Sequence, residues 1–257
     1  MTATSDGLDE FRKRHGFEDW RGSRATDEEL FVWGFFFGGQ ELLGRRALRI
    51  DTVEVPGWPP AVQSLWGVEK DESASGEEPF VRIDVYECTS RAEAHEFVVR
   101  LLAQFQSPLI ERRRNGLGDV AFGMPGDRSV LLARANVAVV VLNAGTEIQA
   151  VEPVAREIDK LFAAPLGLDR STVRPEIRRV ALADGKPARG VPIPLVLEAE
   201  DPLGRRVWFR LSAKGGEFSS RDGRVFYTPE VEGAQAVEVA AINENLGVAT
   251  QTLAFEV

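Results

Sequence analysis

The last third of the chain, residues 176–257, constrains the fold most, because turn sequences divide it into short segments. Between the turns, apolar and polar residues alternate, which is the pattern of strands with one buried face. The turn sequences are Asp184-Gly185, Asp201-Pro202-Leu203-Gly204, Lys214-Gly215-Gly216, Asp222-Gly223 and Asn245-Leu246-Gly247. Strands of this length and spacing predict two antiparallel sheets packed face to face, which is a β-sandwich.

The part of the chain between residues 26 and 163 mixes strand and helix patterns. Apolar residues recur at helical spacing from Ala94 to Phe105 and again from Ile148 to Phe162, and strand-like runs precede and separate these helices. We predict an α+β domain, an antiparallel sheet with helices on one face. A capping box, Thr26-Asp27-Glu28-Glu29, predicts a further helix that ends at Gly38-Gly39. The many aromatic residues between 30 and 37 leave a strand there as the alternative.

The domain organisation follows from a break in these patterns. Residues 164–175 contain two prolines and a glycine and show no apolar periodicity, so they are predicted to be a linker. The predicted layout is a partly ordered N-terminal arm (1–25), the α+β domain (26–163), the linker and the β-sandwich (176–257). A chain of 257 residues has room for two cores. We therefore expect a fragment of residues 174–257 to fold alone.

Charge and hydropathy exclude several classes of partner. The net charge of −9 repels nucleic acid and anionic lipid, so neither is expected to bind. The apolar run at residues 31–37 is far shorter than the roughly 20 residues of a membrane span, so no membrane insertion is expected. The first ten residues are polar and acidic, unlike a secretory signal peptide. The protein is cytoplasmic if the chain is complete, and extracytoplasmic if a signal peptide has been removed.

Three segments between residues 174 and 257 have the strand and turn sequences of a known type of repeat. They are Leu197-Glu198-Ala199-Glu200-Asp201-Pro202-Leu203-Gly204, Val207-Trp208-Phe209, and Gly223-Arg224-Val225-Phe226-Tyr227-Thr228-Pro229 with Gly233. Together they resemble a bacterial immunoglobulin-like or cadherin-like repeat. The resemblance implies an immunoglobulin-like sandwich, an architecture rather than an activity. Cadherin-like relatives bind calcium at an acidic first turn. Here Arg205 and Arg206 flank Asp201 and oppose a cation, so we expect no metal.

Two patterns suggest chemistry and are better explained by structure. Cys88 and His95 are the only pair that suggests nucleophilic catalysis, but a lone cysteine is usually a small buried apolar residue. Residues 116–121 match the dinucleotide fingerprint G-x-G-x-x-A, which requires a helix directly after it. The following residues, 122–126, cannot begin a long helix, so we predict a turn between strands. We expect no catalytic residue and no cofactor.

One aromatic residue of the predicted sandwich is a candidate for binding. If Phe209 faces the core, its neighbour Trp208 points outward between two arginines, and exposed aromatics beside arginine are typical of interface hot spots. The predicted partner-binding residues are Trp208, Arg206, Arg210 and Phe226. The alternative is that Trp208 packs against the N-terminal domain of its own chain.

These observations favour a non-catalytic binding or assembly protein that acts through protein surfaces on an unidentified protein partner. One alternative is a hydrolase-like enzyme with an acidic site in the N-terminal domain and an accessory immunoglobulin-like domain. Another is a structural subunit of a phage-like or secretion particle. A pocket with convergent carboxylates would favour the enzyme, whereas an exposed apolar patch would favour the binding protein.

Overall fold

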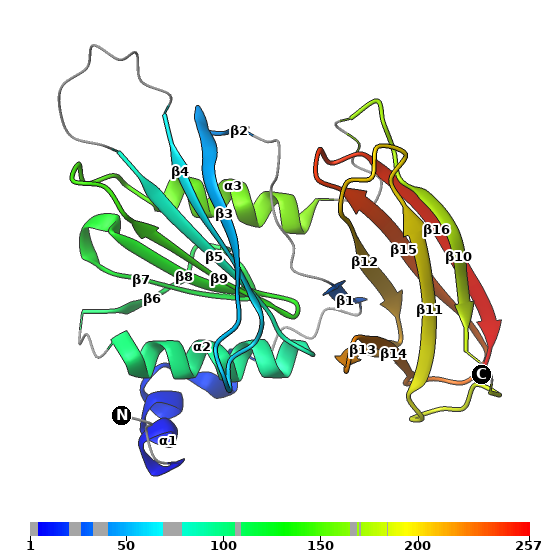
Figure 1. Ribbon diagram of the computed structural model, residues 1–257. Helices are drawn as coiled ribbons and strands as arrows, with labels where there is room; N and C mark the ends of the chain where they lie inside the picture. The colour runs from blue at the N-terminus through cyan, green and yellow to red at the C-terminus, as the bar shows by residue number, and fades with distance from the viewer. Residues whose placement is uncertain are drawn as a thin grey trace. The chain divides into compact units, whose positions relative to one another are not determined.

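The computed structural model describes residues 5–20, 27–32, 41–68, 79–105, 109–164, 169, 171–183 and 185–257. Within these ranges the chain is mostly antiparallel β-sheet with three α-helices (Figure 1). Its internal contacts divide it into two compact units. Residues 1–23 and 39–163 form one, which we call the sheet–helix unit, and residues 24–38 and 164–257 form the other, the two-sheet unit.

The sheet–helix unit is built on one eight-stranded antiparallel sheet, in the order β2-β3-β4-β5-β9-β8-β7-β6. The strands are β2 (Glu41–Leu42), β3 (Arg45–Val53), β4 (Ala61–Gly67), β5 (Val81–Glu87), β6 (Glu111–Arg113), β7 (Val120–Gly123), β8 (Ser129–Arg134) and β9 (Val137–Asn143). The helices are α1 (Ser5–Arg14), α2 (Arg91–Phe105) and α3 (Glu152–Ala163). β5 and β9 pair at the centre of the sheet.

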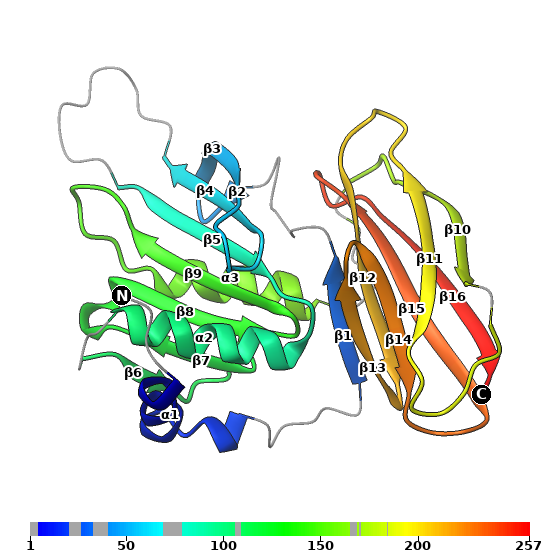
Figure 2. The same ribbon diagram turned by 60° about the horizontal axis from the view of Figure 1, so that its bottom comes forward.

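The helices α2 and α3 pack on opposite faces of this sheet (Figure 2). Buried side chains of α2 form one cluster with alternate residues of the sheet, including Phe122, Leu131 and Val140. The intervening residues face α3, which contacts β8 and β9. The prediction of helices on one face is therefore wrong. The reason is that β8 and β9 are continuous apolar runs buried on both faces, so each face needs a cover.

The sequence signals of α2 and α3 are confirmed. Glu93 N donates to Ser90 Oγ (3.2 Å) and the Glu93 carboxylate accepts from Thr89 N (2.6 Å), so Ser90 caps the start of α2. α3 begins at Glu152 and has Pro153 in its first turn, where a missing N–H costs nothing.

The N-terminal arm is partly helical. After α1, a 3₁₀ helix η1 (Phe17–Trp20) buries both of its aromatic side chains in the α2 cluster. Arg12 of α1 donates to Glu96 of α2. The arm is thus part of the sheet–helix unit.

The two-sheet unit contains two four-stranded antiparallel sheets, β1-β12-β15-β16 and β10-β11-β14-β13. Buried side chains from both sheets form one hydrophobic cluster between them. The strands are β1 (Asp27–Val32), β10 (Glu176–Leu182), β11 (Ile193–Glu200), β12 (Val207–Lys214), β13 (Gly216–Arg221), β14 (Arg224–Pro229), β15 (Ala234–Asn243) and β16 (Val248–Glu256).

The first strand, β1, corrects the predicted helix after Thr26. It pairs antiparallel with β12 through six residue pairs, from Asp27↔Lys214 to Val32↔Phe209 (Figure 2). Leu30 and Val32 are buried in the cluster between the sheets. Pairing and burial of alternate residues override the local helix signal here. Thr26 and residues 33–40, where the helix was predicted to begin and end, lie outside the described residues.

The two-sheet unit therefore combines two distant parts of the chain, whereas the sequence predicted one continuous segment, residues 176–257. A fragment of residues 174–257 lacks β1, and with it the side chains of Leu30 and Val32 that fill the core beside β12. The expectation that this fragment folds alone does not follow from the structure.

The glycine-rich segment at residues 116–121 leads into β7. This confirms the prediction that no helix follows it. Gly118 has a φ of +64°, and a Cβ atom there would lie 2.5 Å from the carbonyl oxygen of Ala133. Gly118 N also donates to Asp159 Oδ2 of α3 (3.1 Å). The glycine is thus required by a close backbone approach within the sheet–helix unit.

We expect Gly118→Ala to destabilise the protein by roughly 2–4 kcal/mol, because a left-handed residue and a backbone clash are combined. Gly116 is the matched control: its φ is +77°, but a Cβ atom there meets nothing within 4 Å. Gly116→Ala should cost only about 1 kcal/mol. The measurement is urea-induced unfolding of the full chain. Equal unfolding midpoints for the two variants would contradict the close approach at Gly118.

Candidate functional site

The predicted partner-binding residues do not form one exposed surface. Phe209 faces the core as expected, and Trp208 points to the other face of β12, yet the Trp208 side chain is 0% exposed. Arg210 is also buried. The prediction of an exposed Trp208 is therefore wrong.

The side chain of Arg210, which was expected to meet a partner, instead contacts side chains of the neighbouring strand β1. Arg210 Nη2 donates to Glu29 Oε1 (2.7 Å), and Nη1 donates to the carbonyl oxygen of Ala164. The guanidinium lies 5.4 Å from the ring centre of Phe31, its cross-strand neighbour. Contacts within the two-sheet unit thus hold this arginine. The sequence did not reveal them because the segment of β1 was predicted to be a helix.

Phe226 belongs to the other sheet. It lies on β14, where Val225 and Tyr227 face the shared core, so half-buried Phe226 points to the outer face of the sheet β10-β11-β14-β13. Trp208 points to the outer face of the opposite sheet. Arg206 is exposed just before β12. The four residues are thus spread over both sides of the two-sheet unit.

The acidic turn at Asp201 is saturated by hydrogen-bond donors. Its carboxylate accepts from Arg205 Nε (2.9 Å) and Nη2 (2.8 Å), from Asn243 Nδ2 (2.7 Å) and from Leu203 N (2.9 Å). These contacts, first among them the hydrogen bonds of Arg205, lower the pKa of Asp201 well below its usual range. The turn is a fixed connection between β11, β12 and the end of β15.

Cys88 is part of the packed core beside α2. It is buried in the α2 cluster, and its backbone exchanges hydrogen bonds with Asn136. Burial raises the pKa of the thiol far above its usual value, which favours the protonated thiol over the nucleophilic thiolate. His95 is buried as well and contacts the edge of the Trp20 ring.

Two carboxylates of the sheet–helix unit, those of Asp119 and Asp159, lie close to the guanidinium of Arg134. Arg134 donates to both oxygens of Asp159 (2.9 and 2.8 Å), and its Nη1 lies 3.8 Å from Asp119 Oδ1. Asp119 also accepts from Ala135 N (2.8 Å). Cations and backbone N–H groups thus bind these carboxylates, an arrangement suited to joining α3 to the turns beside β7 and β8 rather than to accepting a substrate proton.

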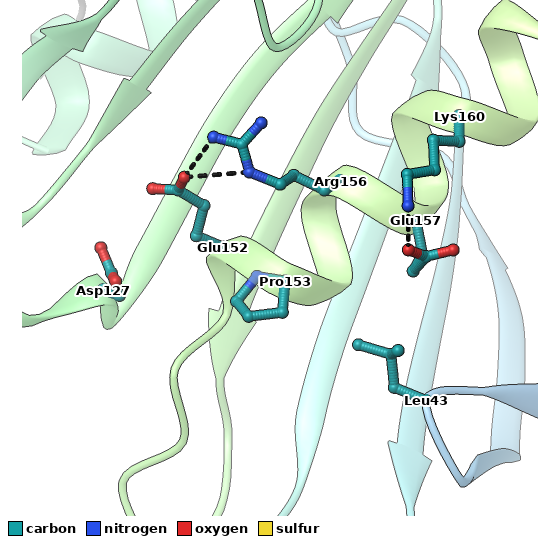
Figure 3. Close-up of a pocket in the computed structure, with 7 residues that line it drawn as sticks. All are labelled: Leu43, Asp127, Glu152, Pro153, Arg156, Glu157 and Lys160. Atoms are coloured by element: carbon teal, nitrogen blue, oxygen red, sulfur yellow. Dashed lines mark hydrogen bonds and ion pairs between the residues drawn. The ribbon is translucent and has the colours of Figure 1, made fainter. Parts of the chain in front are cut away.

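A cavity of about 320 Å³ lies at the start of α3 (Figure 3). Most of its lining is charged: Asp127, Glu152, Arg156, Glu157 and Lys160, with Leu43 and Pro153. The charges are already paired. Arg156 binds Glu152 (2.7 Å), Lys160 binds Glu157 (2.6 Å), and Asp127 accepts from Arg113 (3.1 Å). Since each charge has a partner within the chain, the pocket offers little to a ligand.

A second cavity, of about 280 Å³, lies between α2 and the sheet, and we call it the α2 pocket. Its lining is mainly apolar and aromatic, with one ion pair. The lining residues are Trp58, Arg82, Asp84, Tyr86, Leu101, Gln104, Phe105, Val140 and Leu142. A mostly apolar cavity with a few convergent polar groups is the usual form of a binding site.

The aromatic wall of the α2 pocket is held in place by ring contacts. Trp58 lies against Tyr86 (5.9 Å between ring centres) and edge-to-face against Phe97 (5.2 Å), and Tyr86 lies against Phe97 (4.8 Å). Phe97 is fully buried on α2. Because three elements fix these rings, the wall is pre-formed.

The polar part of the pocket is the pair Arg82–Asp84 on β5. Arg82 Nε donates to Asp84 (2.9 Å) and Arg82 Nη2 donates to Asp84 Oδ2 (2.7 Å), while the Asp84 side chain is almost fully buried. The Arg82 side chain is 41% exposed. Burial, and next the charge of Asp84, raise the pKa of Tyr86 to about 12. The pocket is therefore electrically neutral, and Tyr86 keeps its proton.

The sequence contained a signal for this site. Residues 81–87 alternate: Val81, Ile83 and Val85 form one face, and Arg82, Asp84 and Tyr86 form the other. An ion pair and a tyrosine on a strand at the centre of a sheet must find a partly covered polar environment. Nothing in the sequence around Trp58 indicated that its side chain lines the same pocket as Arg82, Asp84 and Tyr86.

Among the described residues, no group of three or more His, Cys, Asp and Glu side chains is arranged to hold a metal ion. In the described part of the chain, no helix is both long and apolar enough to cross a membrane. No family model, no curated protein and no solved structure matches this chain.

Proposed function

We propose that this protein is a non-catalytic binding protein that takes an apolar side chain of a partner protein into the α2 pocket. The observation that carries the proposal is the pocket itself, an apolar and aromatic cavity with a pre-formed wall. The contacts of its two acidic side chains do not favour acid–base chemistry. Asp84 is held by Arg82, and Tyr86 has a raised pKa.

The charge of the pocket favours a protein segment over a small anion. Asp84 neutralises Arg82, so the site has no net charge to attract a carboxylate or phosphate. Arg82 is still partly exposed, and among the described residues none accepts a hydrogen bond from its Nη1. This N–H group suits a neutral acceptor, such as a backbone carbonyl beside the inserted side chain. A leucine or phenylalanine fits the apolar walls.

The two-sheet unit is, in this proposal, an immunoglobulin-like sandwich that serves as a scaffold. Its sheet orders support this. β10-β11-β14-β13 corresponds to the A-B-E-D order of that fold, and β12-β15-β16 corresponds to C-F-G. β1 is then an eighth strand added beside strand C. The resemblance of residues 174–257 to bacterial immunoglobulin-like repeats points the same way.

Site-specific photocrosslinking tests the partner. A benzophenone amino acid replaces Gln104, which is exposed at the rim of the pocket, and in a control protein it replaces Arg100, exposed one turn earlier on α2. After irradiation in an extract of the native host, we expect the Gln104 probe to capture one protein that the Arg100 probe does not. The crosslinked peptide should contain a large apolar residue.

A blocked pocket provides the second measurement. Leu142→Glu places a carboxylate in the apolar wall directly across the strands from Arg82, and should reduce crosslinking at Gln104 at least tenfold, because it removes apolar contact and occupies the N–H group that a partner carbonyl would use. Val191→Glu, at an exposed apolar residue of the two-sheet unit, is the matched control and should change nothing. If both probes capture the same proteins, or if Leu142→Glu has no effect, the pocket is not the binding site.

A further inference from the structure

The two edges of the eight-stranded sheet differ in how they are protected. One edge is β6, which has only three residues, Glu-Arg-Arg, and short charged edge strands resist pairing with other chains. At the other edge, β2 pairs only with Arg45 and Arg46 of β3. Among the described residues, none pairs with the outer side of β3 from Ala47 to Val53 (Figure 1). Within the described ranges, this edge is the longer and the less protected one.

The open part of β3 exposes large apolar side chains. Leu48 is 51% exposed and Ile50 is 38% exposed. A bulge interrupts the pairing with β4 between Ala47 and Arg49, and from Arg49 to Val53 the register is regular. Exposed apolar side chains on a regular edge strand are a template for pairing with another strand.

We infer that β3 pairs with β3 of a second copy of this chain, so that two eight-stranded sheets join into one. The pairing is antiparallel, with a two-fold axis perpendicular to the sheet at Ile50. This proposal concerns a different surface from the α2 pocket and does not depend on the proposed function. A second copy is chosen because the charges of β3 complement themselves.

The charges favour one register, because it alone places Arg49 opposite Asp51. A two-fold axis perpendicular to the sheet keeps each side chain on its own face, so the axis must pass through a residue position of β3. An axis at Ile50 places Arg49 opposite Asp51 of the second copy, twice in the dimer. An axis at Arg49 or at Asp51 would instead place like charges directly opposite each other, which is unfavourable.

The exposed ion pair of β3 can supply these contacts. Arg49 Nε lies 2.6 Å from Asp51 Oδ2 on the same face of the strand, and Arg49 is 74% exposed. In the dimer, the two pairs combine into one group of four alternating charges. Ile50 then meets Ile50 of the second copy on the opposite face of the joined sheet.

Charge reversal in the full chain tests both the dimer and its register. By sedimentation velocity, the natural sequence should form dimers with a dissociation constant on the order of 10 µM. Arg49→Asp alone places acids opposite acids, and Asp51→Arg alone places bases opposite bases. Each should weaken dimerisation about tenfold or more. An equimolar mixture of these two variants should form heterodimers, because every opposing pair is then complementary.

Glu111→Arg, on the opposite edge strand β6, is the control and should leave the dimer unchanged. Thermal melts at about 1 µM, where all variants are mainly monomeric, should agree, since these side chains are on the surface. A natural chain that is monomeric at about 500 µM would overturn the proposal. So would a dimer that is indifferent to the single reversals, or a mixture that stays monomeric while the natural chain dimerises.

Discussion

A fragment of residues 169–257, which lacks β1, is expected to show no cooperative melt as a monomer. β1 covers the edge of β12 with six residue pairs and inserts Leu30 and Val32 into the core between the sheets. Fully burying such side chains contributes about 1.5–3 kcal/mol each. A domain of this size has only about 5–15 kcal/mol in total. Loss of β1 therefore removes a large part of the stability and leaves β12 as an open apolar edge.

A fusion restores the missing strand. Residues 24–38 are joined to residues 164–257 through a Gly/Ser linker of about ten residues, which has a mean span of about 15–20 Å. Because β1 is supplied in the same chain, this protein should melt cooperatively in circular dichroism. The matched control carries Leu30→Asp and Val32→Asp in the same fusion and should behave like the bare fragment. A bare fragment that melts cooperatively as a monomer, at the temperature of the fusion, would contradict this account of β1.

The second large effect is expected at Asp201. Asp201→Asn should lower Tm by roughly 5–10 °C, although the two side chains have the same shape. The partners of the carboxylate are all donors: Arg205, Leu203 N and Asn243. An asparagine must turn its own NH₂ group toward one of them, and it leaves the Arg205 guanidinium without its counter-charge. The control is Glu200→Gln, an exposed acid beside it, which should shift Tm by no more than about 2 °C.

The difference in Tm between Asp201→Asn and the natural sequence should depend on pH, because the pKa of Asp201 is lowered in the folded protein. The folded protein holds the carboxylate ionised below the pH at which the unfolded chain takes up a proton, near pH 4. The stability that Asp201 contributes is therefore fully present above that pH and decreases as the pH falls further. Melts at pH 7 should separate Asp201→Asn from the natural sequence most widely, and melts near pH 2–3 should show a clearly smaller difference in Tm. An equal difference at both pH values would contradict the role of the carboxylate.

Much of the local structure could be predicted from the sequence, because local patterns determine it. The apolar recurrence from Ala94 to Phe105 predicts α2, and Phe209 faces the core as its alternation requires. Long-range pairing could not be predicted in this way. Residues 27–32 carry acids suited to a helix start, and only β12, almost 180 residues later, makes them a strand.

The same limit applies to the candidate site. Alternation on β5 separates Arg82, Asp84 and Tyr86 from the apolar face, so a polar feature on this strand was readable. The pocket also needs Trp58 and the C-terminal half of α2, and no spacing in the sequence links these segments. The expectation for Trp208 failed for a related reason. Alternation gives the face to which a side chain points, but not what covers that face.

The position of β1 in the chain also determines how early in translation the two-sheet unit can fold. Val207, where β12 begins, follows Val32, where β1 ends, by 175 positions. At about 5–20 residues per second, a ribosome needs roughly 9–35 seconds to make that stretch. During this time β1 has been made and has no partner strand, while all eight strands of the sheet in the other unit, from Glu41 to Asn143, are synthesised. The two-sheet unit, whose first strand precedes every strand of the other unit, can be completed only after β16 has been translated.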